Sequence, residues 1–150
     1  DVCSSDLLPD LSVFPKELIE FESPPGTYFD AFPLLLMTET ALRSMQQKAP
    51  ESQFDIRRFR PNFLIADSGS SADFPENAWE GRRLQLGDAI LQVTVVCPRC
   101  IMTTHGFADL PKDTEIMRAL VREAGGNLGV YAKVEKPGLV RSGDAAVLLD

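Results

Sequence analysis

The chain has 150 residues, the length of one ordinary domain, and its 44% hydrophobic and 25% charged composition is that of a globular protein. No apolar run approaches the roughly 20 residues of a membrane-spanning helix, and the net charge of −7 argues against general nucleic-acid binding. Three cysteines, an odd number, fit a reducing compartment. We therefore expect a cytoplasmic protein with neither a membrane nor a nucleic-acid partner.

Residues 1–28 are predicted to form an N-terminal arm. Prolines recur between residues 9 and 25, which prevents regular strand pairing and leaves room for a short helix over Lys16 to Phe21. The first seven residues resemble translated sequencing adapter, so we expect them, including Cys3, to be non-native and the chain to be a fragment.

A strand, a helix and a second strand are predicted after the arm. Phe32 to Met37 is a compact apolar run typical of a buried strand, and Thr38 to Lys48 carries apolar residues at helical spacing. Thr38 is the expected N-cap of that helix, and Pro50 lies just beyond its end. Phe63 to Ala66 is the second apolar strand.

The second half of the chain is predicted to contain short strands separated by turns, with one further helix. That helix, Thr114 to Ala124, has one apolar face and ends at Gly125-Gly126. Short strands at these intervals favour a barrel or a sandwich. The expected strands are Leu84 to Leu86, Ala89 to Val96, Leu128 to Val134 and Ala145 to Leu149.

Two thiols and a guanidinium follow one of these strands directly, in the segment Cys97-Pro98-Arg99-Cys100. The thiolate is the form that binds metals and attacks electrophiles, and a neighbouring Arg99 favours it. Cys97 is expected to end the buried strand as a small hydrophobe. Cys100 lies beyond the strand and is the better candidate for chemistry.

Other cysteine chemistries remain open at this point. A zinc site needs four ligands, and Cys97, Cys100 and His105 supply three. A thioredoxin-type dithiol places its first cysteine at a helix N-terminus, whereas Ile101 to Thr104 is predicted as strand or loop. His105 is the sole histidine, and no nucleophile-elbow motif accompanies it.

A basic segment at residues 57–62, with the sequence RRFRPN, is the candidate anion site. If it begins the following strand, alternation places Arg58 and Arg60 on one side, where they suit a phosphate. Asn62 adds an amide that can bind the edge of a heterocycle. The alternative is a solvated basic face. A glycine-rich nucleotide loop is absent, because the glycines at 125–129 end a helix.

Short motifs throughout the chain have the order and spacing of one family. Together they resemble the MOSC domain, the molybdenum-cofactor sulfurase C-terminal domain, over residues 29–150, and most resemble its bacterial and mitochondrial amidoxime-reducing branch. The motifs are Phe59-Arg60-Pro61-Asn62, Trp79 with Gly81, Gly87-Asp88, Cys97-Pro98-Arg99-Cys100 with Thr103-Thr104, Gly129-Val130-Tyr131, and Pro137-Gly138 before Gly143-Asp144.

The resemblance implies a mostly β fold, a MOSC-type barrel similar to the β-barrel of pyruvate kinase, with two peripheral helices. It implies the molybdenum cofactor, molybdopterin, with Cys100 as the metal ligand and catalytic residue. It places Arg60, Asn62 and the segment Phe29 to Pro33, with Asp30 and Phe32, near the cofactor. The predicted cofactor-binding set is completed by Arg58, Arg99, Thr103 and Thr104.

The implied activity is the reduction of small N-oxygenated substrates by two-electron removal of an oxygen atom, in a bacterial member of a family that also has pyridoxal-phosphate-linked proteins. Electrons are expected from a separate reductase, because the chain has no flavin, haem or iron–sulfur motif. Full-length relatives carry a further β-rich domain before this one. Two alternatives stay open: a sulfur carrier or cofactor-sulfuration module with a persulfide on Cys100, and a non-catalytic interaction domain with structural thiols.

Overall fold

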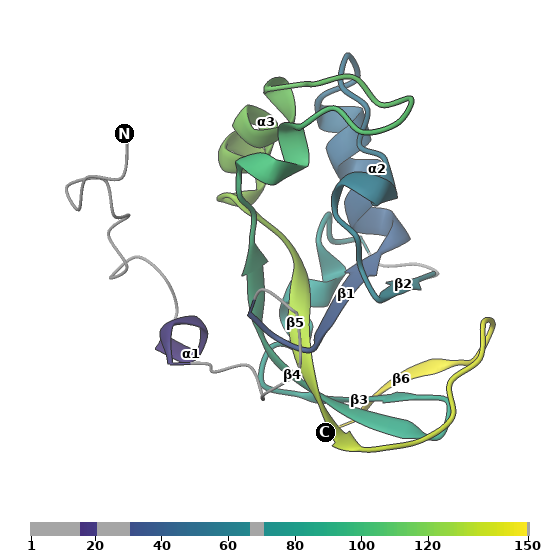
Figure 1. Cartoon of the computed structure of the whole chain (residues 1–150). Coiled ribbons are helices and arrows are strands. Elements are labelled where there is room, and N and C mark those ends of the chain that lie inside the picture. The colour runs from purple at the N-terminus through teal and green to yellow at the C-terminus, as the bar shows by residue number, and fades with distance from the viewer. Residues whose placement is uncertain (1–15, 21–30, 67–70, 150) are drawn as a thin grey trace.

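A strongly curved six-stranded sheet forms the centre of the molecule in the computed structural model, which describes residues 16–20, 31–66 and 71–149 (Figure 1). The strand order is β2-β1-β5-β4-β3-β6, with β1 and β2 parallel and the other neighbours antiparallel. Because β2 and β6 are both edges, this sheet is an open half-barrel. The strands are β1 (Leu34–Thr38), β2 (Phe63–Ile65), β3 (Arg83–Leu86), β4 (Ala89–Pro98), β5 (Asn127–Lys136) and β6 (Ala146–Leu149).

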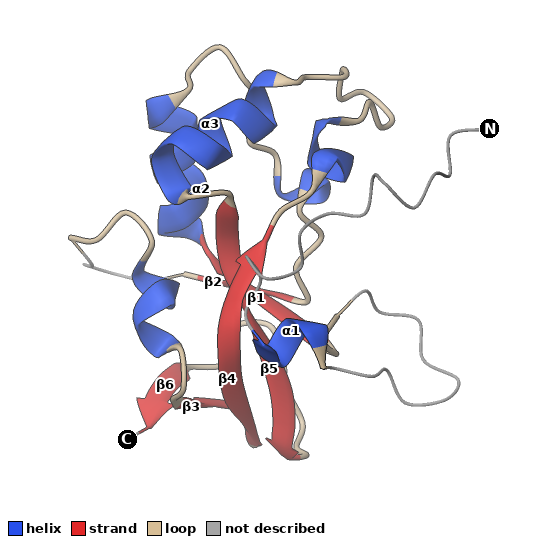
Figure 2. Cartoon of the chain, turned by 90° about the vertical axis from the view of Figure 1, so that its left-hand side faces the viewer, coloured by secondary structure: helices blue, strands red, loops and turns tan. Residues whose placement is uncertain are grey.

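Two ten-residue helices, α2 (Glu39–Lys48) and α3 (Glu115–Ala124), pack together at one end of the sheet (Figure 2). The predicted N-cap of α2 is confirmed, because the Thr38 hydroxyl accepts a hydrogen bond from the Ala41 N–H at 3.1 Å. Gly125 ends α3 in the left-handed conformation, with φ of 59°. The predicted mostly β fold with two peripheral helices is thus confirmed.

The N-terminal arm lies outside the described residues except for α1 (Lys16–Ile19), the short helix expected there. The prediction that residues 1–7 are non-native concerns undescribed residues only. Within the described part of the chain, no helix combines the length and apolar character needed to cross a membrane.

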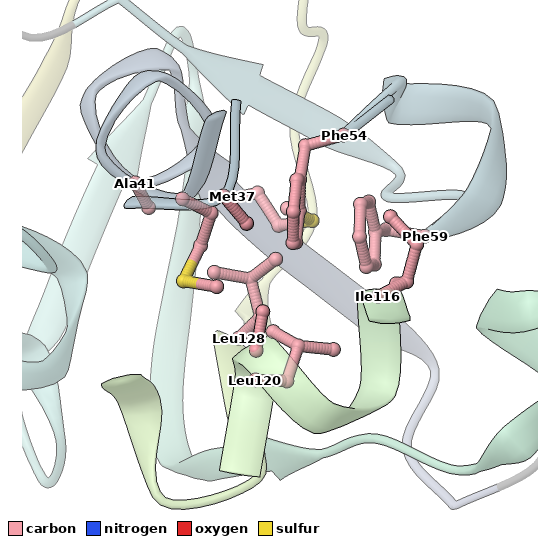
Figure 3. Packing of buried hydrophobic residues seen from close by; sticks show 10 residues of the cluster. Met37, Ala41, Phe54, Phe59, Ile116, Leu120 and Leu128 are labelled. Atoms are coloured by element: carbon pink, nitrogen blue, oxygen red, sulfur yellow. The ribbon is translucent and has the colours of Figure 1, made fainter. Parts of the chain in front are cut away.

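Strand β1 separates two hydrophobic clusters, because its successive side chains point to opposite faces. Leu36 packs into the cluster inside the curved sheet, and Met37 packs under the helices; both are fully buried. Figure 3 shows the helix-side cluster, where Phe54 and Phe59 approach Ile116 of α3. Each such buried side chain stabilises the fold by about 1.5–3 kcal/mol.

Gly129 allows β5 to approach β1 closely. Its φ of +80° is unfavourable for other residues, and a Cβ atom at this position would lie 2.6 Å from the Leu36 carbonyl oxygen. The two antiparallel strands pair here through Leu36 and Val130. Both side chains belong to the cluster inside the curved sheet.

Two segments next to the predicted site differ from expectation, because each forms a 3₁₀ helix: η3 (Ile56–Arg58) and η5 (Ile101–Thr104). The basic segment was expected to begin β2, but the Asp55 carboxylate accepts a hydrogen bond from the Arg57 N–H at 2.9 Å and caps η3. A third 3₁₀ helix, η4 (Pro75–Trp79), supports β1 and α2, because the Thr38 hydroxyl donates to the buried Glu76 carboxylate at 2.7 Å.

In η5, short local hydrogen bonds overcome the β-preference of the sequence. The Thr103 hydroxyl donates to the Cys100 carbonyl at 3.0 Å, and the Thr104 hydroxyl donates to the Ile101 carbonyl at 2.7 Å. Such bonds offer the backbone a turn in place of a strand ladder. The chain therefore turns immediately after Cys100.

Candidate functional site

A groove of about 470 Å³ lies where the end of β4 meets η3 and η5. We call it the Cys100 groove. All the residues predicted from the resemblance line it except Asp30 and Thr104. Asp30 lies outside the described residues, and Thr104 is buried in η5. The lining is Ala31, Phe32, Pro33, Leu35, Arg58, Phe59, Arg60, Asn62, Pro98, Arg99, Cys100, Met102, Thr103 and Tyr131.

A second groove, of about 730 Å³, runs between β2 and the loop before β6. Of the predicted residues it contains only Asn62, and it is lined by no cysteine. Of these two grooves, only the Cys100 groove brings the Cys100 thiol together with the predicted arginines.

The two cysteines occupy opposite environments, although two residues separate them. Cys97 faces inward from β4 and is 1% exposed, as expected for a small hydrophobe, whereas Cys100 is exposed. The Cys100 carbonyl accepts hydrogen bonds from the N–H of Thr103 at 3.2 Å and from its hydroxyl at 3.0 Å. The backbone at Cys100 is therefore fixed while its thiol is open to the groove.

Arg99 joins the end of β4 to β5 and to the residue that follows η3. Its Nε donates to the Leu128 carbonyl at 2.8 Å, and its Nη1 donates to the Phe59 carbonyl at 3.2 Å. The guanidinium also lies over the Phe59 ring, 5.4 Å from its centroid. This side chain therefore holds the walls of the groove together.

Arg58 is also engaged with the backbone, and the premise that it alternates with Arg60 on a strand is wrong. It is the last residue of η3 and only 8% exposed. Its three guanidinium nitrogens all donate to backbone carbonyl oxygens, at distances of 2.7 to 3.3 Å. The acceptors are Gln53, Thr103, His105 and Pro111.

Arg60 differs from Arg58 and Arg99 in its surroundings. Its side chain is exposed, and its guanidinium makes no hydrogen bond or ion pair with any residue that the structure describes. Its backbone has a φ of +53°, in the left-handed region that favours glycine, just after η3. Strained residues of this kind persist where the surrounding structure over-determines them, often at ligand sites.

Asn62 and Phe32 complete the groove beside Arg60. The Asn62 side-chain oxygen accepts a hydrogen bond from the Leu35 N–H at 2.8 Å, which uses it to hold β1. Phe32 is buried and packs against Tyr131, with ring centroids 5.3 Å apart, while the Lys133 ammonium lies over its outer side at 5.2 Å. These rings form an aromatic wall.

Arg57 lies outside the groove in an exposed ion-pair cluster. Its guanidinium binds the Asp55 carboxylate at 2.8 Å and the Asp109 carboxylate at 2.7 Å. Hydrogen bonds from the Arg57 side chain, and then from its backbone N–H, lower the pKa of Asp55 to about 2. Arg57 is therefore a surface residue of η3, and the cap of that helix is Asp55.

Among the described residues, the groove is lined by one thiol and by no other His, Cys, Asp or Glu side chain. Within the described ranges, no three His, Cys, Asp or Glu side chains gather as a metal site, so the zinc site considered from the sequence does not form. The thioredoxin alternative also fails, because Cys97 lies within a strand. A single soft donor fits a metal whose other ligands belong to a cofactor.

Sequence reasoning missed several groove residues, above all Tyr131 and Met102. Tyr131 stood in one of the family motifs, but its ring was not assigned to the site. Met102 is 67% exposed on η5, a turn that the sequence pattern did not predict. Both positions depend on contacts between segments far apart in the chain.

Comparison with solved structures shows the same fold. YiiM from Geobacillus stearothermophilus matches with a TM-score of 0.56 and 18% identity, over 79% of this chain and 55% of that one. YiiM from Escherichia coli matches with a TM-score of 0.57 and 19% identity, also over 79% and 55%.

Among curated proteins, the chain is similar to mitochondrial amidoxime reducing component 2 of Bos taurus, with 29% identity over 78% of this chain and 37% of that protein. Component 1 of Mus musculus is 30% identical over 81% of this chain and 38% of that protein. The chain thus spans less than two fifths of these relatives. These relatives are named as mitochondrial proteins. The cytoplasmic location and the bacterial origin expected for this chain therefore stay predictions.

The family model for the MOSC domain matches residues 25–147, nearly the whole chain. The structure supports the match, because three of the segments that carry family motifs, at residues 59–62, 97–104 and 129–131, contribute to the Cys100 groove. The chain belongs to the MOSC domain family, a family associated with the molybdenum cofactor.

Proposed function

We propose that the Cys100 groove binds the molybdenum cofactor, with the Cys100 thiolate as the metal ligand and the Arg60 guanidinium at the cofactor phosphate. One observation carries the proposal: an exposed thiol and a guanidinium that has no partner among the described residues line the same groove. A thiolate suits a high-valent metal already bound by sulfur, and a guanidinium forms strong charge-assisted bonds with phosphate.

The remaining groove residues have supporting roles in this proposal. Tyr131, which is half-buried against the buried Phe32 ring, provides an aromatic surface for a heterocycle. The Asn62 amide lies at the groove with its oxygen already bonded to β1, which leaves its N–H donors for a ligand. Thr103 fixes the backbone of Cys100, so the thiol is presented from a rigid turn.

We further propose that the protein reduces N-oxygenated small molecules, as the names of the relatives indicate for those proteins. When bound at Cys100, the cofactor would supply a two-electron redox centre that can take an oxygen atom from the substrate. In the reaction the N–O bond of the substrate breaks. The substrate takes up two electrons and two protons, and the products are an N–H group and water. We expect the electrons to come from a separate reductase, because the sequence carries no flavin, haem or iron–sulfur motif.

The persulfide alternative uses the same exposed Cys100, so the test must distinguish sulfur from metal. Chain purified anaerobically should contain molybdenum and pterin in equal amounts if the proposal holds. Labile sulfane sulfur without molybdenum would instead identify a sulfur carrier, and the absence of both would favour an interaction domain. Because the chain spans part of its relatives, the assay should also use the corresponding longer protein.

A further inference from the structure

The Cys100 groove is built from two short helices that are far apart in sequence, and one side chain joins them. Arg58 ends η3, two residues before Arg60, and η5 begins directly after Cys100. The Arg58 Nη1 donates to the carbonyl oxygens of Thr103 at 3.3 Å and His105 at 3.2 Å. The guanidinium therefore bridges the segment that carries Arg60 and the turn that follows Cys100.

We propose that Arg58 is a positioning residue that sets the separation between the Cys100 thiol and the Arg60 guanidinium, and that it does not bind the ligand itself. The inference rests on the proposed function only in taking Cys100 and Arg60 as the ligand-binding pair. The bridge itself is a property of the protein without any ligand.

Thr103 is the link between Arg58 and Cys100. Its carbonyl accepts from Arg58, while its N–H and hydroxyl both donate to the Cys100 carbonyl. On the other side, the Arg58 Nε donates to the Gln53 carbonyl at 3.0 Å, which anchors it to the segment before η3. A planar guanidinium holds several acceptors in one fixed geometry, which the single ammonium of lysine cannot do.

Burial explains why Arg58 positions the groove and Arg60 meets the ligand. Turning the Arg58 guanidinium toward a phosphate would remove the donors from carbonyl groups of Thr103 and Pro111, and a buried polar group without a partner is costly. Arg60 has no such bonds to lose among the described residues, and its side chain is exposed.

The separation can be measured directly with two spin labels, one on Cys100 and one on Arg60→Cys, in a Cys3→Ser background. Cys97 is 1% exposed, so it stays unlabelled in the folded chain. In this pair, Arg58→Lys should broaden the inter-label distance distribution and shift it to longer distances. Arg57→Ala is the matched control, because its ion pairs with Asp55 and Asp109 do not reach η5, and it should leave the distribution unchanged.

If Arg58 only stabilised the fold, its replacement would lower the melting temperature without changing the distance between the labels in the folded chain. An unchanged distribution in folded Arg58→Lys therefore overturns the proposal. If Arg58→Lys does not fold, Arg58→Gln decides, because its shorter amide keeps a polar donor at this position but cannot bridge the carbonyls of Gln53, Thr103 and Pro111. Broadening then supports the proposal, and an unchanged distribution overturns it. The labelled chain carries no cofactor, so a failure of the proposed function does not affect this result.

Discussion

In the wall of the Cys100 groove, the buried Arg58 and the half-buried Arg99 direct their guanidinium groups to backbone carbonyl oxygens. The guanidinium of Arg60, on the exposed rim, has no partner among the described residues. The cysteines repeat the contrast, with Cys97 buried and Cys100 exposed. Side chains of one chemical type thus serve either the fold or a ligand. Burial and hydrogen bonding, rather than residue type, distinguish the two uses.

The largest loss of stability is expected in the wall. Arg58→Met should lower the free energy of unfolding by about 3–5 kcal/mol, because it leaves several backbone carbonyl groups without their donor. Urea denaturation measures this change. The neighbouring Arg57→Ala should cost much less, since it removes only exposed ion pairs. Equal losses of unfolding free energy in Arg58→Met and Arg57→Ala would contradict the distinction between the wall of the groove and the surface.

The rim should show the opposite behaviour at Arg60. Arg60→Ala and Arg60→Gly should both weaken cofactor retention roughly 10- to 100-fold, because each removes one charge-assisted contact. Arg60→Gly alone should also stabilise the fold, by about 0.5–1 kcal/mol, because glycine relieves the left-handed backbone strain. Pterin content after gel filtration and melting curves give the two readouts. Full retention in either variant would place the anion site elsewhere.

The smallest effect concerns acid stability near η3. The pKa of Asp55 is lowered to about 2 in the folded chain, so its ion pair with Arg57 stabilises the fold above pH 4 and is lost as the pH falls from about 4 to 2. The carboxyl is largely solvated, so the loss should not exceed about 1 kcal/mol. Asp55→Asn should flatten the stability profile in this range. An unchanged profile would show that the Arg57 contact is not formed in solution.

Much of the fold could be predicted because it depends on local pattern. The alternation in β4, the Thr38 cap and the Gly125 stop are each visible in a few neighbouring residues. The 3₁₀ helices could not be predicted, because the bonds that form η3 and η5 come from single side chains such as Asp55 and Thr103.

The sequence predicts which residues line the candidate site, but it does not predict what each of them does there. The resemblance selected Arg58, Arg60, Arg99 and Cys100, and all of them line one groove. Which arginine meets backbone carbonyls depends on loops separated by more than 40 residues, as in the contact of Arg58 with Thr103. Sequence alone does not contain that long-range geometry in readable form.

The most direct test of the central claim is the molybdenum content of chain purified anaerobically from cells that make the cofactor, compared between Cys100→Ser and Cys97→Ser. The rim cysteine should be essential, because a serine hydroxyl is a harder and far less acidic ligand than a thiol. The buried cysteine should be dispensable for the metal, since it does not face the groove. Loss of molybdenum in Cys100→Ser with retention in Cys97→Ser is the predicted result. Equal molybdenum in both variants would contradict the account.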